Sequence, residues 1–193
     1  MTETALSWYT PVISAAAKLN IRELVLYAML GSLTFCAKAA MMMLPNIEPV
    51  SLMVMLFAVT FGRKCLYPIS VYVALEFLVY GLNLWSINYL YIWFILALFA
   101  WIFRDMQSSL GWAVLSGGFG LLFGLLCAPV YIVTGGIQSA IAWWISGIPF
   151  DLLHCAGNFA MALMLFCPMR KALQRLLPPP VMCRGAVVSH TSN

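Results

Sequence analysis

Three polar side chains stand close together in an apolar stretch near the C-terminal end of the sequence: Asp151, His154 and Asn158. In an α-helix that begins at Pro149 they occupy positions i, i+3 and i+7 and share one face, opposite a face of Leu, Phe and Ala. A carboxylate, an imidazole and an amide on one face can bind a metal ion, transfer a proton or hydrogen-bond to a solute. The elements that position these groups decide among the three.

A metal site needs more ligands than this face supplies. Asp151 and His154 give two, and the other histidine of the chain, His190, lies in the C-terminal tail. A transition-metal site with two protein ligands is incomplete, so we expect no metal. The sequence contains no HExxH, GxSxG or phosphate-loop motif. We therefore expect neither an enzyme nor a cofactor.

The composition indicates an integral membrane protein. Hydrophobic residues make up 64% of the 193 residues and charged residues only 8%, whereas a soluble domain carries about 25% charged residues. A membrane-spanning helix needs about 20 mainly apolar residues. The apolar stretches predict an all-α membrane protein with six transmembrane helices, at residues 21–44, 49–62, 65–82, 87–103, 110–134 and 149–176. We expect the fifth helix to be loosened by Gly117, Gly118, Gly120 and Gly124.

Basic residues predict the orientation of these helices. They lie at every second junction between helices and at both ends of the helical region: Lys18, Arg22, Arg63, Lys64, Arg104, Arg170, Lys171, Arg175 and Arg184. Because cytoplasmic loops are enriched in Lys and Arg, both termini are predicted to be cytoplasmic. The chain then divides into a cytoplasmic N-terminal segment (1–20), a six-helix transmembrane substrate-binding domain (21–177) and a disordered cytoplasmic tail (178–193).

With this topology the other polar residues gather in the outer half of the membrane. They are Lys38, Asn46, Glu48, Glu76, Asn83, Asn88, Gln138, Asp151, His154 and Asn158. Ionisable groups at membrane depth are costly and are expected to face a cavity or a partner. Two interpretations stay open. One is an outward pocket for a small molecule, lined by rings and a few polar groups. The other is a structural cluster beneath an interfacial aromatic belt, in which Lys38 only neutralises Glu48 or Glu76. We favour the pocket.

Small residues on the first predicted helix form a second feature. Ala28, Gly31 and Ser32 would let another helix approach closely. That helix belongs either to a partner protein or to the same bundle, and the spacing alone does not distinguish the two.

Taken together, several motifs resemble the substrate-binding S components of energy-coupling-factor (ECF) vitamin transporters. The resemblance covers residues 21–176 and rests on six helices with both termini inside. Its motifs are Leu44-Pro45-Asn46-Ile47-Glu48-Pro49-Val50, Phe61-Gly62-Arg63-Lys64, Trp85-x-x-Asn88-Tyr89-Leu90-Tyr91, and Gly147-Ile148-Pro149-Phe150-Asp151 with His154 and Asn158.

The resemblance implies an S-component-like bundle in a bacterial cell membrane, with a vitamin-like ligand bound beneath the loop that joins helices one and two. Carried over to this sequence, the substrate-binding residues are Asn46, Glu48, Trp85, Asn88, Tyr89, Trp143, Trp144, Asp151, His154 and Asn158. The Trp rings would stack on a heterocycle. Such proteins dock on an ECF transmembrane coupling subunit, which carries two ATP-binding cassette ATPases. The docking face here would fall on Ala28 and Ser32, with Gly31 between them, although Ser32 departs from the Ala of the family motif.

We therefore expect the substrate-specific component of an ECF-type ABC importer, with a small, heterocyclic, vitamin-like ligand and no nucleic-acid partner. Two alternatives stay open. The first is a stand-alone secondary carrier of a small solute, and the second is a non-transport membrane protein whose polar cluster is structural.

Overall fold

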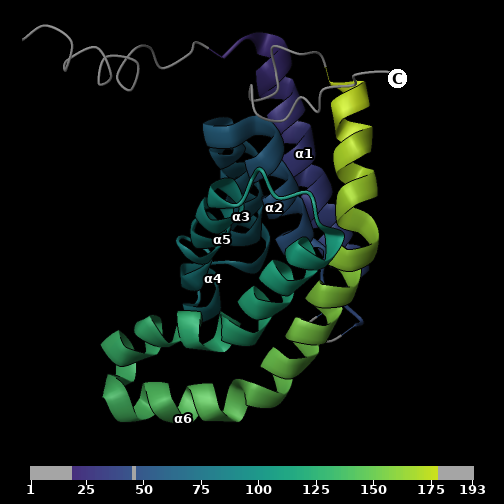
Figure 1. The fold of residues 1–193 in the computed structure, drawn as a ribbon. Helices are drawn as coiled ribbons and strands as arrows, with labels where there is room; N and C mark the ends of the chain where they lie inside the picture. The colour runs from purple at the N-terminus through teal and green to yellow at the C-terminus, as the bar shows by residue number, and fades with distance from the viewer. Residues whose placement is uncertain (1–18, 45–46, 178–193) are drawn as a thin grey trace, which may run out of the picture.

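The computed structural model describes residues 19–44 and 47–177, which form helices and no strand. The helices are α1 Ile21–Ala40, α2 Val50–Phe61, the 3-10 helix η1 Gly62–Cys65, α3 Leu66–Tyr80, α4 Leu84–Asn88, α5 Ile92–Ile102 and α6 Ser109–Leu176 (Figure 1). The prediction of an all-helical fold is confirmed for this part of the chain. Asn46, the first 18 residues and the tail 178–193 lie outside the described residues.

Four helical stretches of the described chain are long and apolar enough to cross a membrane. They are Ile21–Ala40, Val50–Tyr80, Leu84–Ile102 and Ser109–Leu176. Two of the four each contain two of the six predicted helices, because α2 and α3 are joined through η1 and because α6 is counted as one helix. The helices thus fit a membrane protein.

Helix α1 begins at a capping box, and its length separates Arg22 from Lys38. The Asn20 side chain accepts the Glu23 N–H at 2.8 Å, and the Glu23 carboxylate accepts the Asn20 N–H at 3.4 Å. These bonds satisfy two donors at the start of the helix. With 20 residues, α1 is about 30 Å long. Arg22 and Lys38 therefore lie at opposite ends of the bundle.

Helix α2 is the centre of the bundle, since all twelve of its residues are buried. A helix that is apolar on every side is stable only when other elements surround it. Twelve residues extend about 18 Å, less than the roughly 30 Å of a bilayer core. Gly62, with φ 55°, ends α2, and η1 carries the chain on into α3.

The predicted helix at 87–103 is two helices in the structure. Helix α4 starts earlier, at Leu84, where the Asn83 side chain caps it by accepting the Ser86 N–H at 2.9 Å. A turn at residues 89–91 then separates α4 from α5. The Tyr91 hydroxyl fixes this turn, because it lies 2.8 Å from Asn88 Oδ1 and 2.7 Å from the Leu126 carbonyl.

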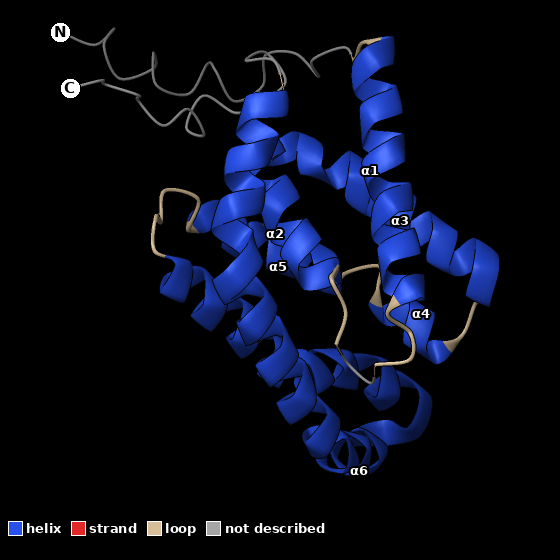
Figure 2. Ribbon diagram, turned by 90° about the vertical axis from the view of Figure 1, so that its right-hand side faces the viewer, coloured by secondary structure: helices blue, strands red, loops and turns tan. Residues whose placement is uncertain are grey.

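Helix α6 folds back on itself (Figures 1 and 2). Gly136 has non-helical torsion angles, φ 78° and ψ 175°, and divides α6 into a first limb (109–135) and a second limb (137–176). The limbs contain the predicted helices at 110–134 and 149–176. Residues 137–148, expected as a loop, are also helical. The second limb therefore starts well before Pro149, which it accommodates within the helix.

Glycines hold the two limbs of α6 together. A Cβ added at Gly120 would lie 2.8 Å from the His154 carbonyl, and one at Gly117 would lie 3.1 Å from the Phe159 Cβ. Gly124 meets Asp151 in the same way. Residues three and four apart share a helix face, so these glycines form a packing surface. The expectation that these glycines loosen the helix stays a prediction; the structure adds that three of them allow close packing. Gly118 alone faces open space.

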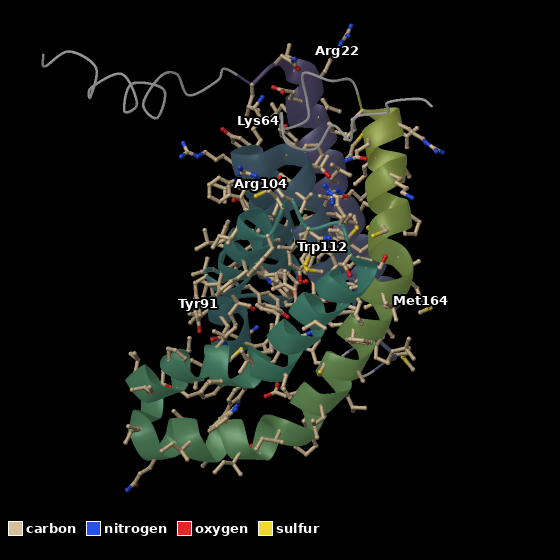
Figure 3. All side chains as sticks on the ribbon, in the orientation of Figure 1. Arg22, Lys64, Tyr91, Arg104, Trp112 and Met164 are labelled. Carbon is tan, nitrogen blue, oxygen red and sulfur yellow. The ribbon has the colours of Figure 1, made fainter. Side chains whose placement is uncertain are left out.

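Basic residues gather at the end of the bundle where α1 begins and α6 ends. Arg22, Lys64 and Arg104 lie near this end in Figure 3. Lys64 pairs with Glu23. The buried Arg170 donates to the carbonyl oxygens of Met106 and Arg104, at 3.1 and 3.3 Å. Several of the basic residues that were predicted to be cytoplasmic therefore lie together toward one end of the bundle.

Candidate solute-binding site

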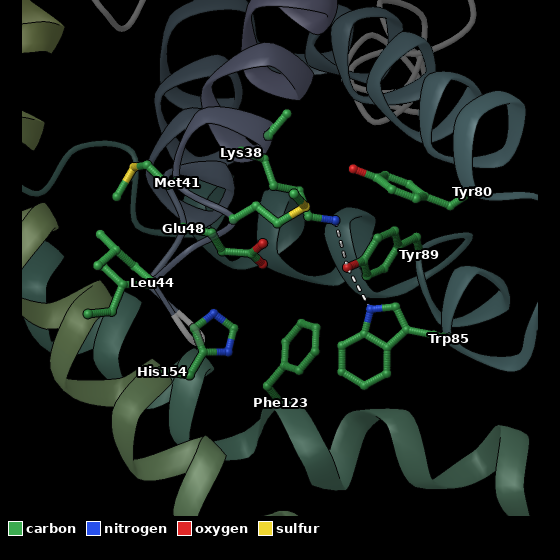
Figure 4. Close-up of a pocket in the computed structure, with 12 residues that line it drawn as sticks. Lys38, Met41, Leu44, Glu48, Tyr80, Trp85, Tyr89, Phe123 and His154 are labelled. Carbon is green, nitrogen blue, oxygen red and sulfur yellow. Dashed lines mark hydrogen bonds between the residues drawn. The ribbon is translucent and has the colours of Figure 1, made fainter.

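Two adjoining cavities lie near the end of α1 that is far from Arg22. The first, of about 300 Å³, is shown in Figure 4 and lies beneath the segment that joins α1 to α2. Its lining residues are Lys38, Ala39, Met41, Met42, Leu44, Ile47, Glu48, Tyr80, Trp85, Tyr89, Phe123 and His154. The second, of about 280 Å³, is lined by Trp85, Phe123, Gly124, Trp143, Ser146, Gly147, Phe150, Asp151 and His154. Trp85, Phe123 and His154 belong to both, so these side chains form the wall that the two cavities share.

Lys38 reaches the first cavity from the last turn of α1 and is held by three acceptors. Its Nζ lies 2.9 Å from both carboxylate oxygens of Glu76 on α3 and 3.1 Å from the Tyr89 hydroxyl. It also lies 4.8 Å from the centre of the Tyr89 ring, which favours a cation. Glu76 is almost fully buried, and pairing with Lys38 offsets the cost of burying its charge.

The carboxylate of Glu48 points into the first cavity between Lys38 and His154 (Figure 4). Among the described residues, no hydrogen bond ends on it. Burial raises the pKa of Glu48 above its usual value near 4.5; the nearby Lys38 charge acts in the opposite direction, and Glu76 adds to the rise. An opposite charge supplied from the cavity would stabilise the ionised form.

His154 and Asp151 present polar atoms without partners. The Nε2 of His154 and the Oδ2 of Asp151 are buried and have no hydrogen-bond partner among the described residues. The other carboxylate oxygen of Asp151 accepts the Gly124 N–H at 3.0 Å. The His154 ring packs edge to face against Phe123, with ring centres 4.8 Å apart. An unsatisfied buried polar atom costs about 1–3 kcal/mol, and both atoms belong to residues that line the cavities.

Aromatic rings make up much of the shared wall. Trp85 donates its indole N–H to the Tyr89 hydroxyl at 2.8 Å. Its ring lies 5.9 Å from that of Phe123 and 6.2 Å from that of Trp143, centre to centre. Trp143 in turn stacks on Tyr131 at 4.2 Å. Trp85 is still 41% exposed, so part of its face remains free to contact a ligand.

The structure brings six of the ten predicted substrate-binding residues to the cavities: Glu48, Trp85, Tyr89, Trp143, Asp151 and His154. The side chains of Asn88 and Asn158 are engaged elsewhere. Asn88 donates to the Leu84 carbonyl at 3.0 Å and accepts from Tyr91, and Asn158 donates to Ser51 Oγ at 3.0 Å. Both are fully buried. Asn158 ties α6 to α2, whereas Asn88 bonds within α4 and to the turn that follows it.

Two further predicted residues do not line either cavity. Trp144 is half-buried on the second limb of α6 and is not among the lining residues. Asn46 lies outside the described residues. The polar face of Asp151, His154 and Asn158 is confirmed as one buried face of a helix, although its third member points into the bundle packing.

The small-residue face on α1 divides into two parts. Ala28 is exposed and Ser32 half-buried, as a partner surface requires. Gly31 is buried against α3, where an added Cβ would lie 2.6 Å from the Pro68 carbonyl and 2.7 Å from the Val71 Cβ. Gly31 therefore serves packing within the bundle, and only Ala28 and Ser32 remain available to a partner.

Several lining residues were not predicted as part of the site, among them Lys38, Tyr80 and Phe123. Lys38 carries a recognisable signal, since a lone ammonium in the outer half of an apolar helix needs acceptors nearby. Phe123 carries none. It reaches the cavity only because Gly120 and Gly124 on either side allow the limbs of α6 to approach, a relation that appears only in three dimensions.

The cavity walls combine aromatic rings with a few polar groups. Within residues 19–44 and 47–177, no group of three His, Cys, Asp or Glu side chains is arranged to hold a metal ion. The walls offer flat apolar rings, one free carboxylate, an imidazole nitrogen and a carboxylate oxygen. Such a combination of rings and few directed polar groups is typical of small-molecule sites.

Comparison of the chain with protein-family models, curated proteins and solved structures gives no match. The functional conclusion therefore rests on the geometry of the cavities.

Proposed function

We propose that this protein binds a small heterocyclic solute in the two adjoining cavities and acts as the substrate-binding S component of an ECF-type ABC importer in a bacterial membrane. In this proposal the chain crosses the membrane six times with both termini in the cytoplasm. The cavities then open near the outer surface, at the end of α1 opposite to Arg22.

The observation that carries the proposal is the pair of unpartnered atoms in the cavity walls. His154 Nε2 and Asp151 Oδ2 are buried, line the cavities and lack protein partners among the described residues. Buried polar atoms in folded proteins nearly always have partners. These two atoms belong to residues that line the cavities, where a bound solute would supply the missing partner.

Size and shape support a small ring-containing ligand. The two volumes, about 300 and 280 Å³, fall near the lower end of the range of small-molecule pockets. Trp85 and Phe123 at the shared wall provide flat faces for stacking. Met41, Met42, Leu44, Ile47 and Glu48 supply part of the lining of the first cavity.

The exposed side of α1 supports a membrane partner. Ala28 and Ser32 lie beside large exposed apolar residues, Leu24, Val25 and Met29. In our proposal this face docks on the transmembrane coupling subunit, whose two ATPase subunits supply the energy. The protein itself needs no cofactor.

Docking is testable with one substitution. Ala28→Trp places a bulky ring on the proposed docking face, and we expect it to abolish co-purification with the coupling subunit while solute binding is retained. Leu78→Trp, at an exposed position of α3, is the matched control. Equal association of both variants would reject this docking face.

The transport function is tested by uptake into vesicles. Vesicles that contain the protein together with a coupling subunit and two ATPases should accumulate solute only when ATP is present inside. Purified protein should gain thermal stability from at least one member of a panel of water-soluble vitamins. A protein that no panel member stabilises, and that carries no co-purifying solute, would contradict the proposal.

The stand-alone carrier is favoured by one observation, the Lys38–Glu76 ion pair near the cavity, because such pairs can carry a coupling proton. Uptake by this chain alone, abolished by an ionophore and indifferent to ATP, would establish that alternative and exclude ours.

A further inference from the structure

The charges around the first cavity do not balance. One ammonium, Lys38, faces two carboxylates, Glu48 and Glu76. An ammonium has three N–H donors. Lys38 directs them to the two oxygens of Glu76 and to the Tyr89 hydroxyl. Lys38 and Glu76 thus neutralise each other, and Glu48 is the group left over.

Glu48 is placed to interact with whatever occupies the cavity. Its carboxylate points into the cavity (Figure 4), and no described residue donates a hydrogen bond to it. Glu48 is half-buried, and a carboxylate that loses hydration without gaining a partner is costly. This loss of hydration raises the pKa of Glu48. A cation in the cavity would relieve this cost, whereas an anion would add to it.

The neighbouring rings also favour positive charge. Tyr80, Trp85, Tyr89 and Phe123 line the same cavity, and the face of an aromatic ring attracts a cation. His154 completes the wall opposite to Lys38 in Figure 4 with an unpartnered nitrogen that can bond a ring substituent.

We propose that the solute is a cation, namely a positively charged heteroaromatic ring system, whose charge lies against the Glu48 carboxylate and whose ring contacts Trp85 and Phe123. This inference rests on the proposed binding function and narrows it, since it rejects solutes whose ring system is neutral or carries a carboxylate. In the bound state Glu48 is ionised and pairs with the ligand, while Lys38 stays with Glu76.

Three probes of similar shape and different charge test the inference. They are 1-methylquinolinium (a cation), 1-methyl-2-quinolone (neutral) and quinoline-2-carboxylate (an anion). Isothermal titration of the purified full-length protein should show that the cation binds at least about tenfold more tightly than the other two, because a charge-assisted contact contributes about 1.5–3 kcal/mol.

Variants of Glu48 identify the group responsible. Glu48→Gln should lose the cation preference, and Glu48→Asp should keep most of it, since the negative charge remains. Asp105→Asn removes an exposed acid at the basic end of the bundle and should leave all three affinities unchanged. The melting temperature of each variant is measured alongside, so that loss of folding is recognised.

The outcomes separate the inference from the proposed function. Tighter binding of the neutral or anionic probe, or unchanged cation binding in Glu48→Gln, overturns the cation inference and leaves solute binding intact. If none of the probes binds, the charge of the solute that co-purifies decides: a cation supports the inference, and a neutral or anionic solute overturns it. If none binds and no solute co-purifies, both the inference and the binding function are wrong.

Discussion

At the scale of single residues, the site depends on how charge is distributed among Lys38, Glu48 and Glu76. Lys38 and Glu76 form a closed pair, with every N–H of the ammonium directed to an acceptor. Glu48 remains outside the pair. The sequence alone could predict that Lys38 neutralises one of the two acids, but α1, α3 and the 41–48 segment must be placed in space before the choice is evident.

Removing one partner of the Lys38–Glu76 pair should destabilise the protein much more than removing both. Lys38→Met leaves Glu76 buried and unpaired, and we expect a loss of about 3 kcal/mol in the free energy of unfolding. The double variant Lys38→Met with Glu76→Met should recover most of this loss, since an apolar pair replaces a buried ion pair at little cost. Unfolding in detergent measures both.

Lys171→Met, at an exposed position of α6, serves as the control and should change stability little. If the double variant is as unstable as the single one, the ion pair does not act as a closed unit.

Glu48 should make the stability of the empty protein depend on pH. Because burial raises its pKa above the ordinary value near 4.5, the folded state holds the proton more tightly than the unfolded state. The stability that comes from this tighter proton binding is complete below the pKa that Glu48 has in the unfolded chain. It is lost as the pH rises through the pKa of Glu48 in the folded protein. We expect the melting temperature to fall over this interval in the wild type and to fall less in Glu48→Gln.

The other titratable groups near Glu48 are Lys38, Tyr72, Glu76, Tyr80, Tyr89 and His154. These groups are present in the wild type and in Glu48→Gln. The difference between the pH profiles of their melting temperatures therefore reports the contribution of Glu48. Identical pH profiles would show that the folded protein does not hold the Glu48 proton more tightly than the unfolded chain does.

At the scale of helices, the central relation is the close approach of the two limbs of α6. Gly117, Gly120 and Gly124 lie along the crossing, and His154 and Asp151 on the facing limb reach the cavities because of it. A spacing of three and four residues on an apolar helix is typical of a packing face. This spacing is visible in the sequence, but the sequence does not show which helix packs against it.

Gly120→Ala should move the limbs apart. Its Cβ would lie 2.8 Å from the His154 carbonyl, so backbone must shift. We expect a destabilisation of about 1–3 kcal/mol and weaker solute binding, since His154 moves with its backbone. Thermal unfolding and titration with the co-purified solute measure the two effects.

Gly118→Ala is the matched control, because an added Cβ there meets nothing within 4 Å. It should be neutral or stabilising by up to about 1 kcal/mol, as Ala favours a helix over Gly. Equal losses in both variants would mean that the limbs do not meet through this face.

Much of the helical framework follows from apolar stretches and their periodicity. The face of Asp151, His154 and Asn158 was predictable because i, i+3 and i+7 coincide on any helix. The helical form of residues 137–148 was not, since periodicity does not show that a chain reverses at one glycine. Gly136 alone, with φ 78°, makes that reversal. The roles of Asn88 and Asn158 were equally hidden, because an amide that bonds within the protein has the same sequence signature as one that binds a ligand.

At the scale of the whole molecule, the cluster of basic residues and the cavities lie toward opposite ends. Arg22, Lys64 and Arg104 lie at one end, and the cavities lie beyond Lys38, near the other end of α1. The positive-inside rule assigns the basic end to the cytoplasm. Under this assignment Met43 and the cavities would lie toward the outside.

Cysteine labelling tests this orientation. In a cysteine-free background, Met43→Cys should react with a membrane-impermeant thiol reagent added to intact cells, because Met43 is 87% exposed and lies at the outer end. Arg22→Cys and Arg104→Cys should react only after the membrane is opened. The reverse pattern would invert the topology and place the cavities toward the cytoplasm.

The central claim is that the adjoining cavities hold a small solute, and native mass spectrometry of the purified protein tests it most directly. The wild type should carry a single small-molecule adduct. Replacement of the shared wall by Trp85→Ala with Phe123→Ala should remove the adduct, while Gly118→Ala retains it. A wild-type protein without an adduct, which also gains none when vitamins are added, would contradict the account.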